Sequence, residues 1–192
     1  MQVYDSAEKT TSNDIHVLML MEFCNGTLFN FISEREERFK TTGVGITEHE
    51  LLKILSDVTS ALTHMHMQDR PIAHRDIKIE NILRGTDGSW KLCDFGSCST
   101  RQIENVLPHM RSDVEYDIEK STTPLYRAPE QLDFYLGYKI GERVDVWALG
   151  CVLYTLMFFK SPFNENERLN QKSGKVRYPA QSPYSMGLMR LL

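Results

Sequence analysis

The chain has 192 residues, of which 41% are hydrophobic and 25% are charged, and this composition is ordinary for a single folded domain. Its formal net charge of -4 gives no sign of clustered Lys and Arg, so we expect no nucleic-acid partner. The N-terminus has no apolar signal-peptide core, and the longest apolar stretch, residues 146–159, is too short to span a bilayer, so we expect no transmembrane segment.

The cysteines give no indication of a metal site. They lack the paired short spacings of a zinc site and lie scattered at positions 24, 93, 98 and 151. We therefore expect reduced thiols and a cytoplasmic protein.

The chain opens with a polar segment. Residues 1–15 are predicted to be a polar loop or a frayed start, because their hydrophobic pattern has no period. The apolar run at 16–21 predicts a strand, and a short acidic, glycine-containing connection is expected at 22–26. A helix is expected from residue 28 to about residue 39, before the sequence TTGVG at 41–45 interrupts it.

A long helix and a hairpin are expected next. Thr47 and Glu50 form a capping-box pattern ahead of apolar residues that recur at helical spacing, which predicts a long helix with one buried face. These residues are Leu51, Leu52, Ile54, Leu55, Val58, Ala61, Leu62 and Met65. Apolar runs at 82–83 and 90–93 flank the sequence GTDG, which favours a turn, so a small antiparallel pair is expected.

The second half of the chain contains an irregular segment followed by helices. Residues 97–123 show weak patterning and many polar side chains, and we expect a long exposed loop with room for one short helix. Residues 144–159 predict a buried helix. Two weaker helices are expected near 164–173 and 184–192.

Three short motifs follow one another in the order HRDIKIEN at 74–81, DFG at 94–96 and APE at 128–130. Each motif alone is weak. Together, with a hairpin between the first two and a long loop between the last two, they resemble the signature set of protein kinases. The resemblance implies an α+β, protein-kinase-like fold over residues 16–192, consisting mainly of the helical C-lobe with a hinge strand and a small β-hairpin.

The residue types in these motifs suit phosphoryl transfer to a Ser or Thr hydroxyl of a protein substrate. Asp76 would orient the acceptor hydroxyl and accept its proton, while Asn81 and Asp94 offer hard oxygen ligands to the Mg2+ that accompanies ATP. Lys78 would reach the transferring phosphate, and Gly96 would let the chain turn sharply after Asp94. By resemblance, Thr123 lies in the loop that touches Asp76 and Lys78 in kinases acting on Ser or Thr.

The resemblance also implies a nucleotide site. Met21 would be the gatekeeper of a hinge formed by Glu22, Phe23 and Cys24, whose backbone would bind adenine, and Leu83 would form the floor beneath the ring. An ordinary strand end with a core methionine is the alternative.

Other motif positions are expected to have structural or regulatory roles. Asp145 lies in an apolar stretch, where a carboxylate is costly to bury unless it is hydrogen-bonded. In kinases the matching aspartate holds the backbone of the catalytic loop, and the side chains matching His74 and Phe95 stack within the core. A further hypothesis is a phosphate that pairs with Arg75, carried by one of the hydroxyl residues Ser112, Tyr116 and Ser121.

Several stretches resemble the Numb-associated kinase family, which includes adaptor-associated, cyclin-G-associated and yeast actin-patch kinases. They are residues 20–26, 71–83, 91–97, 122–130, 145–151 and 161–163. The resemblance implies Ser/Thr phosphorylation of endocytic adaptors or actin-regulating proteins, at endocytic or cortical membrane sites.

The sequence departs from that pattern at both ends. It has no glycine-rich loop with a following strand lysine, and no glutamate-bearing helix to pair with that lysine. It also stops before the position at which kinases supply the arginine that pairs with Glu130. We expect a partial kinase domain lacking most of the N-lobe and the end of the C-lobe. We also expect it to be inactive alone, because the missing lysine stabilises charge on the phosphates and such stabilisation provides most of the rate enhancement. The alternatives are a kinase-derived scaffold and, disfavoured by APE and Asp145, a small-molecule phosphotransferase.

Overall fold

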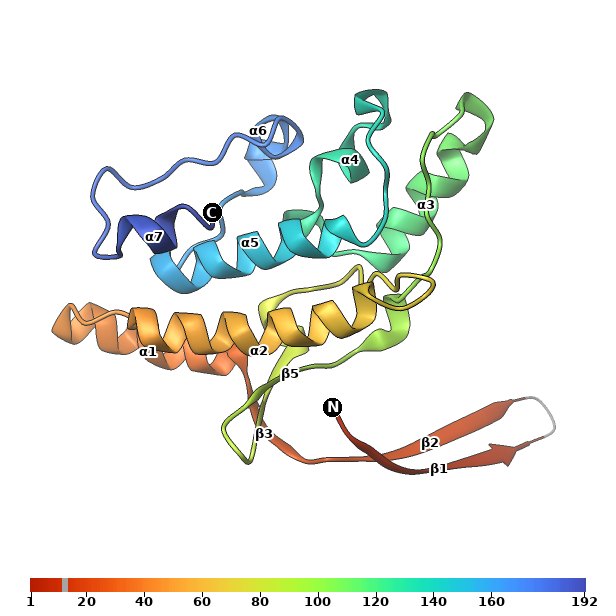
Figure 1. Ribbon diagram of the computed structural model, residues 1–192, viewed down its shortest axis with the longest axis horizontal. Helices are drawn as coiled ribbons and strands as arrows, with labels where there is room; N and C mark the ends of the chain where they lie inside the picture. Colours follow the sequence, from red (N-terminus) through yellow and green to blue (C-terminus); the bar gives the residue numbers. More distant parts are fainter. Residues whose placement is uncertain (12–13) are drawn as a thin grey trace.

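The computed structural model describes residues 1–11 and 14–192, and it consists of a helical body, a small sheet and an extended hairpin (Figure 1). The α+β fold class expected from the sequence is confirmed. The helices are α1 (Leu28–Thr42), α2 (Glu48–His66), α3 (Arg111–Ser121), α4 (Pro129–Leu132), α5 (Arg143–Phe158), α6 (Arg168–Lys172) and α7 (Met186–Met189). The strands are β1 (Val3–Thr10), β2 (Ile15–Met21), β3 (Cys24–Thr27), β4 (Ile82–Gly85) and β5 (Trp90–Leu92).

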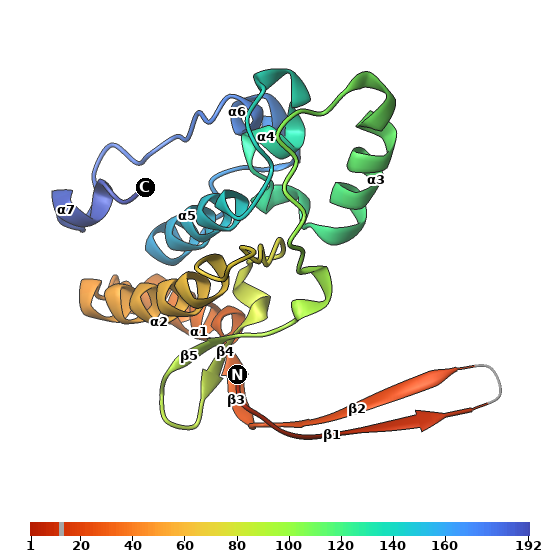
Figure 2. The same cartoon turned by 45° about the vertical axis from the view of Figure 1, so that its right-hand side comes forward.

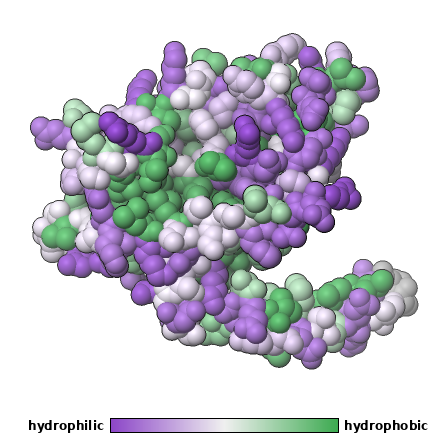
Figure 3. Space-filling view, viewed as in Figure 1, coloured by the Kyte–Doolittle hydropathy of each residue, from purple (hydrophilic) through white to green (hydrophobic). Residues whose placement is uncertain are grey.

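The hairpin β1–β2 corrects the expectation for the start of the chain. The polar loop predicted for residues 1–15 is wrong for Val3–Thr10, which form β1 and pair antiparallel with β2. Every described side chain of both strands is exposed, so backbone hydrogen bonds hold β1 and no burial pattern could reveal it. Residues 12 and 13 of the predicted loop lie outside the described residues. The hairpin projects from the body (Figure 2), and apolar side chains line the arm that it forms in Figure 3.

The second sheet has the antiparallel order β3-β4-β5. The predicted pair β4–β5 is confirmed, and Gly88 supplies the left-handed backbone of its turn with φ 79°. Strand β3 was not expected, because the segment 22–26 was interpreted only as a connection. This sheet joins the end of the hairpin to the segment that follows residues 74–81.

Helices α1 and α2 are set by their caps. Thr27 and Thr47 each accept a hydrogen bond from the backbone three residues on, and both helices begin with a complete capping box. Gly43 ends α1 in the left-handed conformation with φ 70°. The capping-box helix predicted from Thr47 and Glu50 is therefore confirmed.

One large core unites α1, α2, α5 and the small sheet. Figure 1 shows α2 and α5 lying side by side, and their facing apolar side chains are buried. The fully or almost fully buried members include Leu28, Leu51, Ile54, Val58, Ile77, Ile82, Leu92, Val152 and Leu156. This core supports the segment that carries the first motif, because Ile77 belongs to it.

A second, smaller core lies beneath the segment 97–123, for which a long exposed loop with one short helix was expected. Eleven of its residues form α3, whose Val114 and Ile118 pack with Ile103, Ile140 and Val144. Only two α3 side chains are buried, so the sequence pattern of this helix is weak. The one short helix that the prediction allowed for is therefore α3, and it is anchored on its own apolar cluster.

The helices expected in the C-terminal part of the chain are present, and two of them are shorter than predicted. The predicted buried helix at 144–159 is α5. The weaker helices near 164–173 and 184–192 are reduced to α6 and α7, of five and four residues. Among the described residues, no helix combines the length and the apolar character that crossing a membrane requires.

Candidate active site

Asp145 anchors the loop that carries the first motif. Its fully buried carboxylate, on α5, accepts backbone N–H groups of His74 at 2.7 Å and of Arg75 at 2.8 Å. His66, at the end of α2, lies 2.8 Å from the same carboxylate. Arg75 has φ 70°, a conformation that costs energy for a residue other than glycine, and these two N–H contacts help to hold it. The loop is thus fixed to α5 before any ligand is considered.

Beyond this anchor the chain is extended, and its side chains alternate between core and surface. Ile77 and Ile79 point into the large core, while Lys78, with φ -156° and ψ 167°, lies between them. Asp76 and Lys78 consequently share the opposite side of this segment, away from the core. The alternation of apolar and polar residues in DIKI is the local cause of the site's geometry.

Three side chains contact the carboxylate of Asp76. Thr123 donates its hydroxyl to Asp76 Oδ1 at 2.6 Å, and Lys78 Nζ lies 2.8 Å from Asp76 Oδ2. Asn81 Nδ2 donates to the same Oδ2 at 3.0 Å, and Lys78 Nζ also donates to Thr123 Oγ1 at 3.2 Å. The four residues predicted as catalytic therefore converge, although Thr123 is separated from the others by more than 40 residues.

The environment of Asp76 keeps its carboxyl ionised. Burial alone would raise the pKa, but the hydrogen bonds from Lys78, Thr123 and Asn81 outweigh it and hold the pKa below the ordinary value. Asp76 is therefore a carboxylate at neutral pH, able to accept a hydrogen bond from an incoming hydroxyl.

Asn81 and Asp94, the predicted metal ligands, are linked through the backbone. Asn81 lies in a short 3-10 turn, and its carbonyl oxygen accepts the Cys93 N–H at 3.0 Å. Asp94 follows directly after Cys93, so this bond brings the two positions into adjacent segments. Asn81 binds Asp76 through its amide nitrogen. Its side-chain oxygen has no hydrogen-bond partner among the described residues.

The turn at Asp94 differs in detail from the sequence-based expectation. Asp94 itself adopts the left-handed conformation, with φ 60° and ψ 70°, whereas Gly96 was expected to provide the sharp turn. The carboxylate of Asp94 accepts the Gly96 N–H at 3.4 Å, and a Cβ on residue 96 would lie 3.3 Å from it. Gly96 therefore leaves room for the carboxylate and keeps its amide available to it.

The donor set fits Mg2+ held together with a nucleotide. Within residues 1–11 and 14–192, no three His, Cys, Asp or Glu side chains gather in a way that could hold a metal ion by themselves. The exposed Asp94 carboxylate and the Asn81 side-chain oxygen are hard oxygen donors, which suit Mg2+ when phosphate oxygens complete its coordination. The residues therefore fit a metal that arrives with ATP.

The predicted hinge residues connect β2 to β3. Met21 ends β2 and Cys24 begins β3, where it pairs with Gly85 of β4. The Glu22 carboxylate is bound by Lys91 of β5 and by the Gln2 N–H, and these contacts lower its pKa. The segment predicted to be the hinge is thereby tied to the small sheet.

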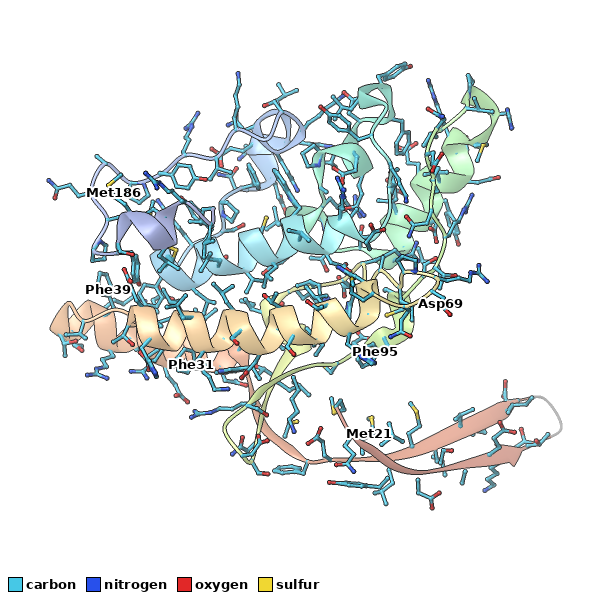
Figure 4. The ribbon with its side chains drawn as sticks, viewed as in Figure 1. Met21, Phe31, Phe39, Asp69, Phe95 and Met186 are labelled. Carbon is cyan, nitrogen blue, oxygen red and sulfur yellow. The ribbon has the colours of Figure 1, made fainter. Side chains whose placement is uncertain are left out.

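The predicted nucleotide contacts are less closely gathered than the Asp76 cluster. Leu83 is half-buried on β4 opposite Thr27 of β3, while Phe23 is 75% exposed and Met21 is 42% exposed. In Figure 4, Phe95 lies on the side of the helical body that faces the hairpin bearing Met21. Phe95 also packs against the His74 ring at a centroid distance of 5.5 Å, but only His74 is buried. Phe95 is 50% exposed, so the expectation that it stacks within the core is wrong.

The segment that presents Thr123 is held by residues that sequence reasoning missed. Arg127 donates to the hydroxyl of Thr122 at 2.8 Å and to its carbonyl at 3.2 Å. Gln171 of α6, itself buried, donates to the carbonyls of Pro124 and Arg127, both at 2.9 Å. Nothing in the sequence marks Gln171, because its role depends on a contact across more than 40 residues.

Arg75 was expected to bind a phosphorylated residue of the segment 97–123, but it already has protein partners. Its guanidinium donates to the Ser97 carbonyl at 2.6 Å and to the Asp117 carboxylate of α3 at 2.6 and 3.5 Å. Asp117 is a further residue that the sequence did not single out.

The comparisons with known proteins agree with the motifs. The family model described as "Protein kinase domain" matches residues 1–185. The chain is 39% identical over 185 residues to the protein kinase domain-containing protein ppk38 of Schizosaccharomyces pombe, covering 96% of this chain and 28% of that protein.

Two probable serine/threonine-protein kinases of Dictyostelium discoideum are also similar. One is 34% identical over 192 residues, covering 100% of this chain and 17% of the relative. The other is 39% identical over 187 residues, covering 96% of this chain and 22% of the relative. The chain thus spans less than a third of the length of each of these three relatives. Since the family match extends over most of its residues, the chain belongs to the protein kinase domain family.

Proposed function

We propose that this chain carries the phosphoryl-transfer site of an enzyme that phosphorylates Ser or Thr hydroxyls of proteins with ATP. The convergence of Lys78, Thr123 and Asn81 on the Asp76 carboxylate is the observation that carries the proposal. The printed names of two relatives, both probable serine/threonine-protein kinases, support the same acceptor class.

The proposed role of Asp76 is to orient the acceptor. A carboxylate with a lowered pKa is a weak base, so it is better suited to aligning a hydroxyl than to removing its proton early. Such a role matches a loose transition state, in which the hydroxyl loses its proton late. Lys78, beside this carboxylate, is placed to neutralise negative charge on the transferring phosphoryl group.

The proposed cofactors are ATP and Mg2+. Asp94 and the side-chain oxygen of Asn81 would hold the metal, which supplies charge neutralisation between the phosphates when bound. The hinge formed by Met21, Glu22, Phe23 and Cys24 would hold adenine through its backbone, with Leu83 beneath the ring.

The proposed substrates follow from the resemblance to the Numb-associated kinase family. They are endocytic adaptor subunits or actin-regulating proteins, at endocytic or cortical sites of the cytoplasm. The stretches that carry this resemblance include the segment 122–130, whose Thr123 contacts Asp76.

We also infer that this chain is inactive or nearly so by itself. Its sequence contains no glycine-rich loop with a following strand lysine, which are the parts that grip the phosphates in kinases. The alternative is a kinase-derived scaffold without catalysis. Retention of Asp76, Asn81 and Asp94 favours an enzyme, because a scaffold has no physical need for metal ligands.

A phosphate-transfer assay with radioactive ATP tests the proposal. The chain alone should transfer no more phosphate to Ser- and Thr-containing proteins than its Asp94→Asn variant. Any longer product of the same gene that includes a glycine-rich strand pair should transfer phosphate, and Asp94→Asn should abolish that transfer. Transfer by the chain alone that depends on Asp94 would refute the inactivity, and a longer product without such transfer would favour the scaffold.

A further inference from the structure

Arg75 and Asp117 form a two-pronged ion pair between the motif loop and α3. The guanidinium nitrogens lie 2.6 and 3.5 Å from the two carboxylate oxygens of Asp117, and the third guanidinium nitrogen binds the Ser97 carbonyl. Both side chains are largely shielded, with 17% and 33% exposure. Such forked arginine contacts are stronger and more directional than a contact with a lysine.

Few apolar contacts hold α3 on the body of the protein, and the ion pair adds to them. Only Val114 and Ile118 anchor the middle of α3, and at its start Arg111 stacks over the Tyr135 ring at 4.3 Å. Asp117 is three residues beyond Val114, so it falls on the neighbouring face of the helix. Its bond to Arg75 therefore ties the last turn of α3 to the motif loop.

The same tie helps to position Thr123. Helix α3 ends at Ser121, only two residues before Thr123, whose hydroxyl binds Asp76. The segment from Asp117 to Thr123 is consequently fixed at both ends to the loop that contains Arg75 and Asp76. Loosening the first contact would weaken the second, because a short chain segment transmits the displacement, although Arg127 still holds Thr122.

The hydroxyl residues considered as phosphorylation sites have no such contact. Ser112 and Tyr116 are exposed, with Tyr116 at 67%, and neither bonds to Arg75. Ser121 donates to Asp117 Oδ1 at 3.5 Å. A phosphoryl group there would compete with Asp117 for the same guanidinium, since two anions would then face one cation.

We propose that Asp117 is the resident anion for Arg75, a positioning residue that keeps α3 and Thr123 in place without phosphorylation of this segment. The ion pair orders the segment whatever chemistry the site performs. Its consequence for phosphoryl transfer rests on the proposed function, so the test measures order rather than activity.

Amide hydrogen exchange on the bacterially expressed chain tests this directly, with mass spectrometry confirming that it carries no phosphate. Peptides covering 111–123 should be protected in this unphosphorylated protein. Asp117→Asn should accelerate their exchange about tenfold, because the shielded guanidinium loses its charged partner. Asp113→Asn, an exposed carboxylate on the same helix, should change exchange by less than about twofold. Asp117→Glu should restore most of the protection.

Two results would overturn the proposal. One is an unprotected α3 in the phosphate-free chain, and the other is equal exchange in Asp117→Asn and Asp113→Asn. If circular dichroism shows that Asp117→Asn is unfolded, Arg75→Lys replaces it, because lysine keeps the charge but loses the fork. Its matched control is Arg101→Lys at an exposed position, and faster α3 exchange in Arg75→Lys alone is expected. Equal exchange in these two variants would also contradict the proposal.

Discussion

At the scale of single residues, the Asp76 carboxylate organises the site. Its two oxygens accept hydrogen bonds from a hydroxyl, an ammonium and an amide that come from two distant stretches of sequence. Burial raises the pKa of this carboxyl, but the three hydrogen-bond donors lower it by more, so the net pKa lies below the ordinary value. The folded state therefore binds this proton more weakly than the unfolded chain does.

A pH dependence of stability follows from that lowered pKa. The ionised Asp76 stabilises the folded state at pH values above the ordinary carboxyl pKa of about 3.9, and this contribution is lost as the pH falls through the lower folded value. Asp76→Asn should therefore be less stable than the unmodified chain near pH 6, and the gap between their free energies of unfolding should narrow toward pH 3. Urea denaturation at a series of pH values measures this gap.

The exposed carboxylate Asp113 provides the control for this measurement. Asp113→Asn should show a small gap that changes little with pH, since its side chain is exposed on α3. A gap for Asp76→Asn that stays constant from pH 6 to pH 3 would show that ionisation of Asp76 does not stabilise the fold.

Sequence reasoning identified the residues that contact each other at Asp76 because the motifs HRDIKIEN and TTP carry them at fixed positions. It missed Asp117 and Gln171, which act through contacts across many residues and stand in stretches without a motif. It also attributed the sharp turn after Asp94 to Gly96, whereas Asp94 itself adopts the left-handed backbone conformation. Residue type indicated that a turn was needed but not which residue would make it.

At the scale of elements, helix α2 forms where it does because of its cap. Thr47 accepts the Glu50 N–H, and the Glu50 side chain returns to the Thr47 N–H at 3.0 Å. Glu50 also binds Arg35 of α1, so one carboxylate both starts α2 and joins it to its neighbour. This helix ends at His66, which contacts Asp145, so its position bears on the motif loop.

Replacing the cap residue should destabilise the fold measurably. Thr47→Ala removes the acceptor for the Glu50 N–H and should lower the free energy of unfolding by about 1 kcal/mol. Thr59→Ala, at an exposed position inside the same helix, is the control and should have little effect or a slightly stabilising one. Urea denaturation of both variants decides the question, and equal stabilities would contradict a role for the cap.

The elements whose bounds the sequence indicated clearly have long buried faces or defined caps. Strand β1, which was missed, and α3, whose bounds were not predicted, have few or no buried side chains. The apolar spacing from Leu51 to Met65 is visible because that face is buried in the large core. Strand β1 has no buried side chain, and α3 has only Val114 and Ile118. Backbone pairing and a small local core formed these elements, and neither leaves a strong period in the sequence.

At the scale of the whole molecule, the hairpin β1–β2 exposes an unusual amount of apolar surface. Leu18 and Leu20 are 61% and 63% exposed, and the other side chains of β2 are exposed as well. A strand pair with free edges and apolar faces favours association between molecules. We expect the isolated chain to self-associate through this hairpin.

Adding charge to the hairpin should reduce that association. The double variant Leu18→Lys and Leu20→Lys should be more nearly monomeric than the unmodified chain in sedimentation velocity over a range of concentrations, because like charges would repel at the edge. Leu169→Lys, on α6 at 81% exposure, is the control for a single exposed leucine. An unchanged sedimentation profile for the double variant would place the association surface elsewhere.

The whole account depends on Asp94 and Asn81 holding a divalent ion that arrives with ATP beside Asp76. Paramagnetic broadening of amide NMR signals by Mn2+ with ATP tests this most directly, because it detects weak binding and locates it along the chain. The account predicts selective broadening of the signals of Asp76, Asn81 and Gly96 that requires ATP and is lost in Asp94→Asn. Broadening centred on another part of the molecule, or unchanged in Asp94→Asn, would contradict it.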